Sequence, residues 1–183
     1  STEYFFVSNA RSIGDFNSEV HYQEFIEGHG LRDLVMPIRT AIEAVNRLGE
    51  AGFWVQALTS RPADNPTCVY DTFSWLASSG LRVDRLDFAA EKLLWVTQSE
   101  PFAASQVVCA LEDAPQHAQG YTRHGVLVVA PVKSYNGCLQ DDPLVRMYDS
   151  PTDIFSTVMD LARWTRRMPV GRRDSVVSVT EHS

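Results

Sequence analysis

The stretch VVCALEDAPQHAQGYTRHGVLVVA, residues 107–130, decides the fold class. It begins with a short apolar run at 107–111 and closes with a second one at 126–130. Residues 115–124, between these runs, have the pattern of a short helix, and Gly125 follows it. A strand, a helix and a second strand in this order predict a βαβ unit, which pairs its two strands in parallel.

The rest of the chain repeats this alternation. At 37–50, for example, Ile38, Ile42, Val45 and Leu48 recur every three or four residues, which is the period of one helix face. The predicted strands are 3–7, 53–58, 107–111 and 126–130. The predicted helices are 18–27, 37–50, 68–79, 88–97, 115–124 and 151–167, with a loop at 131–145. We therefore expect an α/β protein with a parallel sheet and helices on both faces.

Composition limits the organisation and the partners of the chain. Its 183 residues fit one domain, which we place at 1–167, and we expect the polar stretch 168–183 to form a flexible tail. The net charge of −7 argues against general affinity for nucleic acids or anionic membranes. No apolar run approaches the roughly 20 residues of a membrane span, and no signal peptide is visible. The three cysteines fit neither a disulfide framework nor a metal site, so we expect a cytoplasmic protein.

Polar side chains follow three of the predicted strands, where an open α/β sheet gathers its ligands. They are Ser8, Asn9, Ala10, Arg11 and Ser12 after the first strand, Thr59, Ser60 and Arg61 after the second, and Glu112 and Asp113 after the third. Lys92 lies between the last two groups. Hydroxyls and an ammonium suit a phosphate, and a carboxylate pair suits a divalent cation. A strand-end threonine is also common as a turn residue, and a lone lysine is also common on a solvated helix.

Three of these segments resemble motifs of the haloacid dehalogenase-like (HAD) superfamily. ALTSRP (57–62) resembles the second motif, AEKLL (90–94) the third, and ALEDAP (110–115) the fourth. The resemblance covers roughly residues 4–136 and is greatest to small 5′-nucleotidases and to the phosphatase domain of polynucleotide kinases. It implies a three-layer, Rossmann-like parallel sheet with no large cap.

The resemblance also assigns roles to single residues. It implies that Thr59, with Ser60, binds a phosphate oxygen and that Lys92 neutralises phosphate charge. It implies that Asp113, with Glu112 beside it, holds Mg²⁺.

The first motif departs from the family pattern. In VSNARSIGD (7–15), Ser12 takes the position of the family's threonine and Asp15 that of its later aspartate. Ser8 stands where the family has its nucleophilic aspartate, and Ala10 stands where it has its acid–base aspartate. Loss of a nucleophile typically costs about 10⁴–10⁶ in rate, so we expect standard phosphatase activity to be absent. The Mg²⁺ site also loses an anionic ligand at Ser8, so we expect Mg²⁺ binding to be weak or absent.

Two sets of basic residues are candidates for contacts with ligands or partners. Arg11 lies at the mouth of the predicted site, where it would offset Asp113 in place of a metal, close on a ligand phosphate or simply lie at the surface. Arg61 and Asp15 are further candidate site residues. RWTRR and GRR, within 163–173, form a basic cluster. This cluster complements the dipole at the end of the last predicted helix, or it docks an anionic or protein partner through that helix and the tail.

Three functions remain open from the sequence. The first, which we favour, is a HAD-like pseudoenzyme that binds phosphate or a nucleotide, or serves as an interaction module. The second is an active phosphohydrolase on nucleotides or nucleic-acid ends. The third is a structural component of an assembly. The four tryptophans, at 54, 75, 95 and 164, fit a buried core.

Overall fold

The structure, a computed structural model, describes residues 37–89, 91–94 and 107–167. The chain forms two compact units, Ser1–Ala90 and Glu91–Ser183, and each is described by itself. The elements predicted at 3–7 and 18–27 and the tail at 168–183 lie outside the described residues, and the single domain at 1–167 stays a prediction. In the described ranges, no helix is both long enough and apolar enough to cross a membrane.

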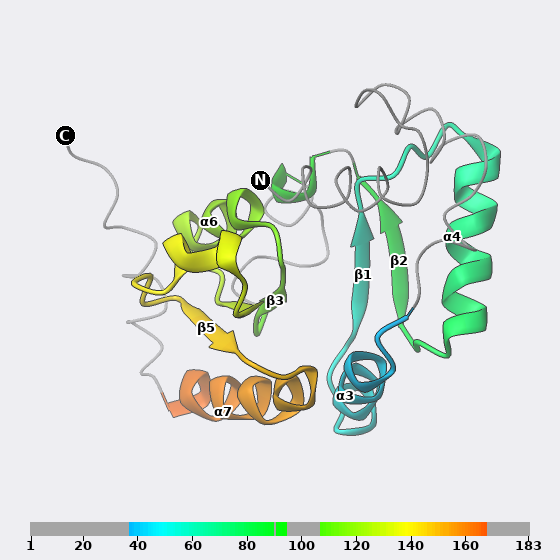
Figure 1. Cartoon of the computed structure of the whole chain (residues 1–183). Helices are drawn as coiled ribbons and strands as arrows, with labels where there is room; N and C mark the ends of the chain where they lie inside the picture. The colour runs from blue at the N-terminus through cyan, green and yellow to red at the C-terminus, as the bar shows by residue number, and fades with distance from the viewer. Residues whose placement is uncertain (1–36, 90, 95–106, 168–183) are drawn as a thin grey trace. The chain divides into compact units, whose positions relative to one another are not determined.

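In its described residues, the first unit contains two helices and a pair of parallel strands. Along the chain these are α3 (Arg39–Glu50), β1 (Gln56–Thr59), α4 (Pro66–Ser79) and β2 (Arg85–Phe88). The register of β1 and β2 runs from Gln56 opposite Arg85 to Thr59 opposite Phe88. Figure 1 shows α4 alongside the two strands, as the crossover that parallel pairing requires.

Local sequence explains where these helices begin and end. Asn65 caps α4, because its Oδ1 accepts hydrogen bonds from the backbone N–H groups of Thr67 and Cys68. Gly80 ends α4 with φ 77°, a left-handed conformation that glycine adopts without strain. Helix α3 begins at Arg39 with Ile38 as its N-cap, so the placement of Pro37 in its first turn was wrong.

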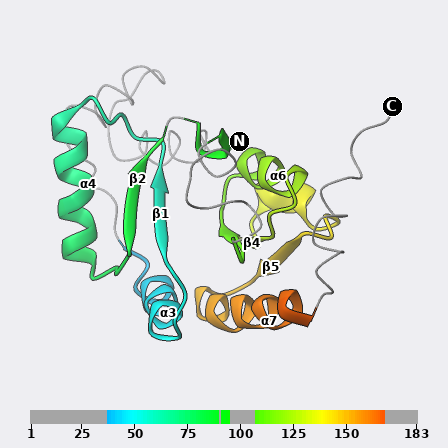
Figure 2. The same cartoon turned by 180° about the vertical axis from the view of Figure 1, so that it is seen from behind.

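The part of the second unit that the structure describes is a three-stranded parallel sheet with helices on both sides. Its strands β3 (Ala110–Leu111), β4 (Val128–Pro131) and β5 (Val145–Tyr148) are adjacent in that order. Helix α6 (Pro115–Arg123) connects β3 to β4, and the short helix η3 (Ser134–Leu139) lies between β4 and β5. The short helix η4 (Pro151–Asp153) leads into α7 (Ile154–Arg167). Figures 1 and 2 show α6 and α7 on opposite sides of this sheet. The coarse α/β class predicted from the sequence is confirmed.

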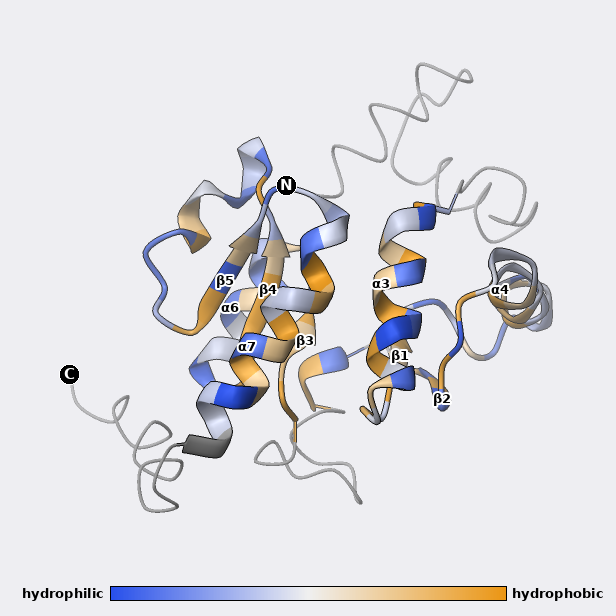
Figure 3. Ribbon diagram, turned by 90° about the horizontal axis from the view of Figure 1, so that it is seen from below, coloured by the Kyte–Doolittle hydropathy of each residue, from blue (hydrophilic) through white to orange (hydrophobic). Residues whose placement is uncertain are grey.

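Strand β4 forms the centre of the second unit. Residues 126–130 are all buried, and β4 is mostly orange in the hydropathy colours of Figure 3. On one side, Val128 and Ala130 pack with Ala118 and Tyr121 of α6 and with Leu139 of η3. On the other side lies α7, whose buried positions follow a helical period of three and four residues. They are Ile154, Val158, Leu161 and Ala162.

Several sequence predictions need correction. Phe88 belongs to strand β2, not to a helix at 88–97, although residues 92–94 are helical. The predicted loop at 131–145 contains η3 and the first residue of β5, a strand that was not predicted. Both missed strands are short and alternate polar with apolar residues, so neither has the continuous apolar run of a buried strand. Trp54 and Trp164 are exposed, so their assignment to the core was wrong.

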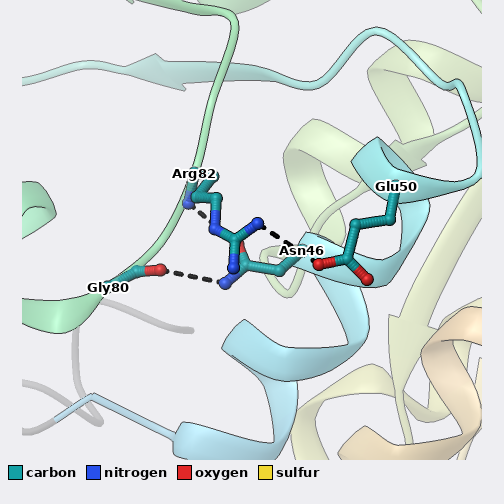
Figure 4. Close-up of polar contacts among 4 residues, drawn as sticks. All are labelled: Asn46, Glu50, Gly80 and Arg82. Atoms are coloured by element: carbon teal, nitrogen blue, oxygen red, sulfur yellow. Dashed lines mark hydrogen bonds and ion pairs between the residues drawn. The ribbon is translucent and has the colours of Figure 1, made fainter.

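An asparagine side chain ties α3 to the chain that follows α4. Figure 4 shows Asn46 between the backbone groups of Gly80 and Arg82. Asn46 Nδ2 donates to the Gly80 carbonyl at 2.9 Å, and Asn46 Oδ1 accepts from the Arg82 N–H at 2.8 Å. The amide therefore satisfies two backbone groups at once, as a neighbouring strand would. The Arg82 guanidinium also pairs with Glu50 at 3.2 Å, but both of these side chains are exposed.

We expect Asn46→Ala to lower the free energy of unfolding by about 1–2 kcal/mol, because it removes two hydrogen bonds that each contribute about 0.5–1.5 kcal/mol. The matched control, Glu50→Ala, removes only an exposed ion pair of about 0–1 kcal/mol. Urea denaturation followed by circular dichroism measures both. If Asn46→Ala lowered the free energy of unfolding no more than Glu50→Ala does, the two hydrogen bonds of Asn46 would not stabilise the fold.

Candidate functional site

Thr59 is the last residue of β1, so its side chain lies at the carboxyl end of that strand. Its Oγ1 accepts a hydrogen bond from the backbone N–H of Arg61 at 3.3 Å. This bond uses the hydroxyl as an acceptor and leaves its proton to be donated elsewhere. Ser60, the next residue, is exposed. A short turn at the end of β1 therefore holds two hydroxyl groups.

Arg61 reaches back onto α4. Its Nη1 donates to Thr72 Oγ1 at 2.9 Å, and Thr72 Oγ1 in turn donates to the Cys68 carbonyl at 2.7 Å. Burial lowers the pKa of the Arg61 guanidinium, and the nearby Cys68 and Asp71 partly offset this effect. Arg61 thus braces the turn against α4, and its contact with a ligand stays a prediction.

Lys92 and Glu112 form an ion pair beyond the end of β3, within the second unit. Lys92 Nζ lies 3.5 Å from Glu112 Oε2, and the two side chains are only 18% and 8% exposed. The other carboxylate oxygen, Oε1, accepts the backbone N–H of Ala114 at 3.1 Å. Each oxygen of Glu112 therefore has a protein donor, and the carboxylate fixes the position of the ammonium group.

Asp113 has a different environment from that of its neighbour Glu112. It is exposed, and its charge raises the pKa values of Tyr135 and Tyr148, for which burial is the larger cause. Tyr135 lies in η3 beyond β4, and Tyr148 ends β5. The carboxyl ends of three parallel strands thus bring a carboxylate and two protonated phenols near one another. Neither tyrosine was among the predicted site residues, because neither η3 nor β5 was predicted from the sequence.

Glu112 and Asp113 are the described carboxylates of the Mg²⁺ site that the resemblance implies, and Ser8, its remaining position, lies outside the described residues. No group of three His, Cys, Asp or Glu side chains in the described ranges could hold a metal ion. Glu112 would have to break its ion pair with Lys92 to bind a cation. The groups whose pKa values the Asp113 charge raises are two tyrosines. Hard cations prefer several oxygen ligands, often carboxylates, and weak or absent Mg²⁺ binding at these residues stays a prediction.

Burial alters two further groups in the second unit. It raises the pKa of Tyr121 to about 12, and the nearby Glu112 carboxylate adds to this effect. It also raises the pKa of Cys109 to about 12, which leaves this thiol protonated and a poor nucleophile at neutral pH.

The predicted site residues fall into three groups. Thr59, Ser60 and Arg61 lie together in the first unit, and Lys92, Glu112 and Asp113 lie in the second. Of these, Lys92 and Glu112 are in direct contact. The residues of the first motif lie outside the described residues. They are Ser8, Ala10, Arg11, Ser12 and Asp15.

Comparison with known proteins finds no matching family model, no similar curated protein and no similar solved structure. The resemblance to the HAD superfamily therefore rests on the quoted motifs alone.

We expect Lys92→Met to lower the free energy of unfolding by about 2–4 kcal/mol, because it leaves the Glu112 carboxylate buried without its cation. The double variant Lys92→Met with Glu112→Gln should recover part of that loss, since no buried charge remains. Urea denaturation of both single variants and the double variant gives the coupling energy. Strictly additive losses would show that the two side chains do not interact.

The raised pKa of Tyr121 predicts a loss of stability in alkali. An unfolded tyrosine ionises near pH 10, at about its reference pKa. The stabilisation from the protonated, buried phenol is therefore complete below about pH 10 and is lost as the pH rises through about 12. Urea unfolding at pH 8 and pH 11 should show a smaller drop for Tyr121→Phe than for the wild type. Tyr70→Phe, which removes an exposed hydroxyl, should behave as the wild type does.

Proposed function

We propose that the chain is a HAD-like protein that binds the phosphate group of a nucleotide or another small phosphorylated molecule and does not hydrolyse it. The observation that carries this proposal is the ion pair of Lys92 and Glu112. An unpaired lysine would move freely, whereas this ammonium is held at 3.5 Å from a nearly buried carboxylate. A cation fixed beyond a strand end of a parallel sheet is suited to a bound anion.

The hydrogen-bond donors of Lys92 and Thr59 suit a phosphate group in particular. An ammonium group has three N–H donors, and the contact with Glu112 uses one direction. Thr59 contributes a hydroxyl whose oxygen is already held by the Arg61 N–H. Charge-assisted hydrogen bonds from such groups are the strong ones in phosphate sites. Thr59 and Lys92 match the second and third motifs of the HAD superfamily, and each of these motifs supplies a phosphate contact in that family.

The absence of hydrolysis rests on the first motif and on Glu112. The family's covalent step needs a carboxylate nucleophile and a second carboxylate for proton transfer. Ser8 and Ala10 stand in those positions. Glu112 offers no replacement, because both of its oxygens already accept protein donors.

We expect an excess of EDTA to leave binding of a nucleoside monophosphate unchanged, because no metal is needed. Thr59→Val and Lys92→Met should each weaken this binding by about tenfold or more, as each removes a hydrogen-bond donor whose loss costs about 1.5–3 kcal/mol when the partner is charged. Isothermal titration calorimetry measures both effects. Arg163→Met is the matched control, since this exposed cation of α7 forms an ion pair with the exposed Asp160 on the same helix.

The same proteins test the proposal against catalysis. Release of phosphate from the nucleoside monophosphate should not exceed that of the Lys92→Met variant, with or without Mg²⁺. Mg²⁺-dependent turnover by the wild type that Asp113→Asn abolishes would overturn the pseudoenzyme proposal and favour an active phosphohydrolase. Equal affinity of the wild type, Thr59→Val and Lys92→Met would overturn the phosphate site itself.

A further inference from the structure

Gly120 lies in the middle of helix α6, where a glycine needs an explanation. It is the sixth of the nine residues of Pro115–Arg123. Apart from proline, glycine is the residue that most destabilises a helix interior. The backbone does not require it, because its φ is not positive, unlike that of Gly125 just beyond the helix. Its carbonyl accepts a hydrogen bond from His124 Nδ1 at 3.0 Å, but any residue would supply that carbonyl.

The space beside Gly120 is occupied by a side chain from another segment. A Cβ atom at position 120 would lie 3.3 Å from Leu93 Cδ2 and 3.9 Å from Leu93 Cδ1. The first distance is shorter than the optimal separation of two carbon atoms, so a larger residue would push Leu93 away. Gly49 of α3 differs, because the nearest atom to a Cβ there would be Val55 Cγ2 at an ordinary 3.9 Å. Gly120 therefore permits a close contact between Leu93 and α6.

This contact fixes the backbone beside Lys92. The Leu93 side chain packs against the apolar cluster that includes Ala118 and Tyr121 of α6. Of the described segment 91–94, Leu93 is the residue that packs on this cluster, and the first and last residues of the segment are exposed. Since Lys92 directly precedes Leu93, the position of Leu93 on α6 sets the point from which the lysine side chain extends.

Helix α6 also borders the carboxylate that pairs with Lys92. Burial is the larger cause of the raised pKa of Tyr121, the residue after Gly120, and the nearby Glu112 charge adds to it. Glu112 is tied to the start of α6 as well, because its Oε1 accepts the N–H of Ala114, the N-cap of this helix. The two partners of the ion pair, 3.5 Å apart, are thus both positioned from α6.

We propose that Gly120 is a positioning residue for the Lys92 ammonium group. The missing Cβ lets Leu93 lie against α6, and this contact holds Lys92 within reach of Glu112. The effect on ligand affinity rests on the proposed phosphate site, since a displaced ammonium would no longer meet the phosphate at the same point. The effect on the ion pair depends on no ligand.

The ammonium group of Lys92 can be observed by itself, because the chain contains two lysines, Lys92 and Lys133. Protein labelled with ¹⁵N-lysine therefore gives two side-chain signals in NMR spectra, and Lys92→Met identifies the signal of Lys92. An ammonium held by a carboxylate exchanges its protons with water more slowly than a solvated one. Lys133 is exposed and serves as the internal reference. We expect Lys92 to exchange more slowly than Lys133 in the wild type.

Gly120→Ala should accelerate the exchange of Lys92 toward the rate of Lys133, because the added methyl group displaces Leu93. It should also weaken binding of a nucleoside monophosphate by about three- to tenfold in calorimetry. Leu93→Ala removes the same contact without adding an atom and should have the same two effects. Gly120→Ala combined with Leu93→Val adds one carbon and removes one, so this volume-conserving pair should restore slow exchange and affinity.

Gly49→Ala is the matched control, because the same substitution in α3 meets no close neighbour and should change neither property. Circular dichroism verifies that each variant is folded. In a folded Gly120→Ala, exchange of Lys92 as slow as in the wild type would overturn the proposal, as would an equal effect of Gly49→Ala. If Gly120→Ala did not fold, unchanged exchange in Leu93→Ala would overturn it in the same way.

The two measurements separate the positioning of Lys92 from the phosphate site. Faster exchange in Gly120→Ala, with no binding of nucleoside monophosphate by any of these proteins, would confirm the positioning role and overturn the proposed function. Weaker binding by Lys92→Met, with binding and exchange unchanged in Gly120→Ala, would retain the phosphate site and overturn the role of Gly120. Faster exchange together with weaker binding, both reversed by adding Leu93→Val, would establish both.

Discussion

The burial of strand β4 is the constraint on which the second unit depends. A strand that is apolar on both faces needs a cover on each side and a hydrogen-bonded neighbour on each edge. Strands β3 and β5 supply the edges, while α6 and η3 cover one face and α7 the other. Because β4 pairs in parallel on both edges, the chain returns to the same end of the sheet before each new strand. As a result the polar residues that follow the strands, Glu112 and Asp113 among them, share the carboxyl end.

Sequence patterns predicted the elements with strong, continuous signals. The apolar run after Gly125 that forms β4, the period of α3 and the helical pattern at 151–167 all stood out, and each element was found within a few residues of its predicted position. Strands β2 and β5 escaped prediction because four residues of alternating character give too short a pattern to separate from a loop. Trp54 was predicted to lie in the core but is exposed, because hydrophobicity alone does not determine burial.

The candidate site was predictable in its residue types and less so in its contacts. Thr59, Glu112 and Asp113 could be placed at strand ends because each follows an apolar run. That Lys92 would pair with Glu112, while Asp113 lies near enough to Tyr135 and Tyr148 to raise their pKa values, depends on turns whose geometry the sequence does not show. Two adjacent acids therefore have different surroundings. One is a nearly buried counter-ion, and the other is an exposed carboxylate beside phenols.

The placement of α7 has a consequence for synthesis of the chain. Each strand pairing in the second unit closes a crossover of only roughly 20 residues, so loop closure costs little entropy and the sheet assembles from neighbouring segments. Helix α7 is nevertheless the last described element to leave the ribosome. Until it emerges, one apolar face of β4 has no cover from the other described elements of the unit. A nascent chain paused at that stage has an assembled sheet with an exposed apolar face, and chaperones recognise surfaces of this kind.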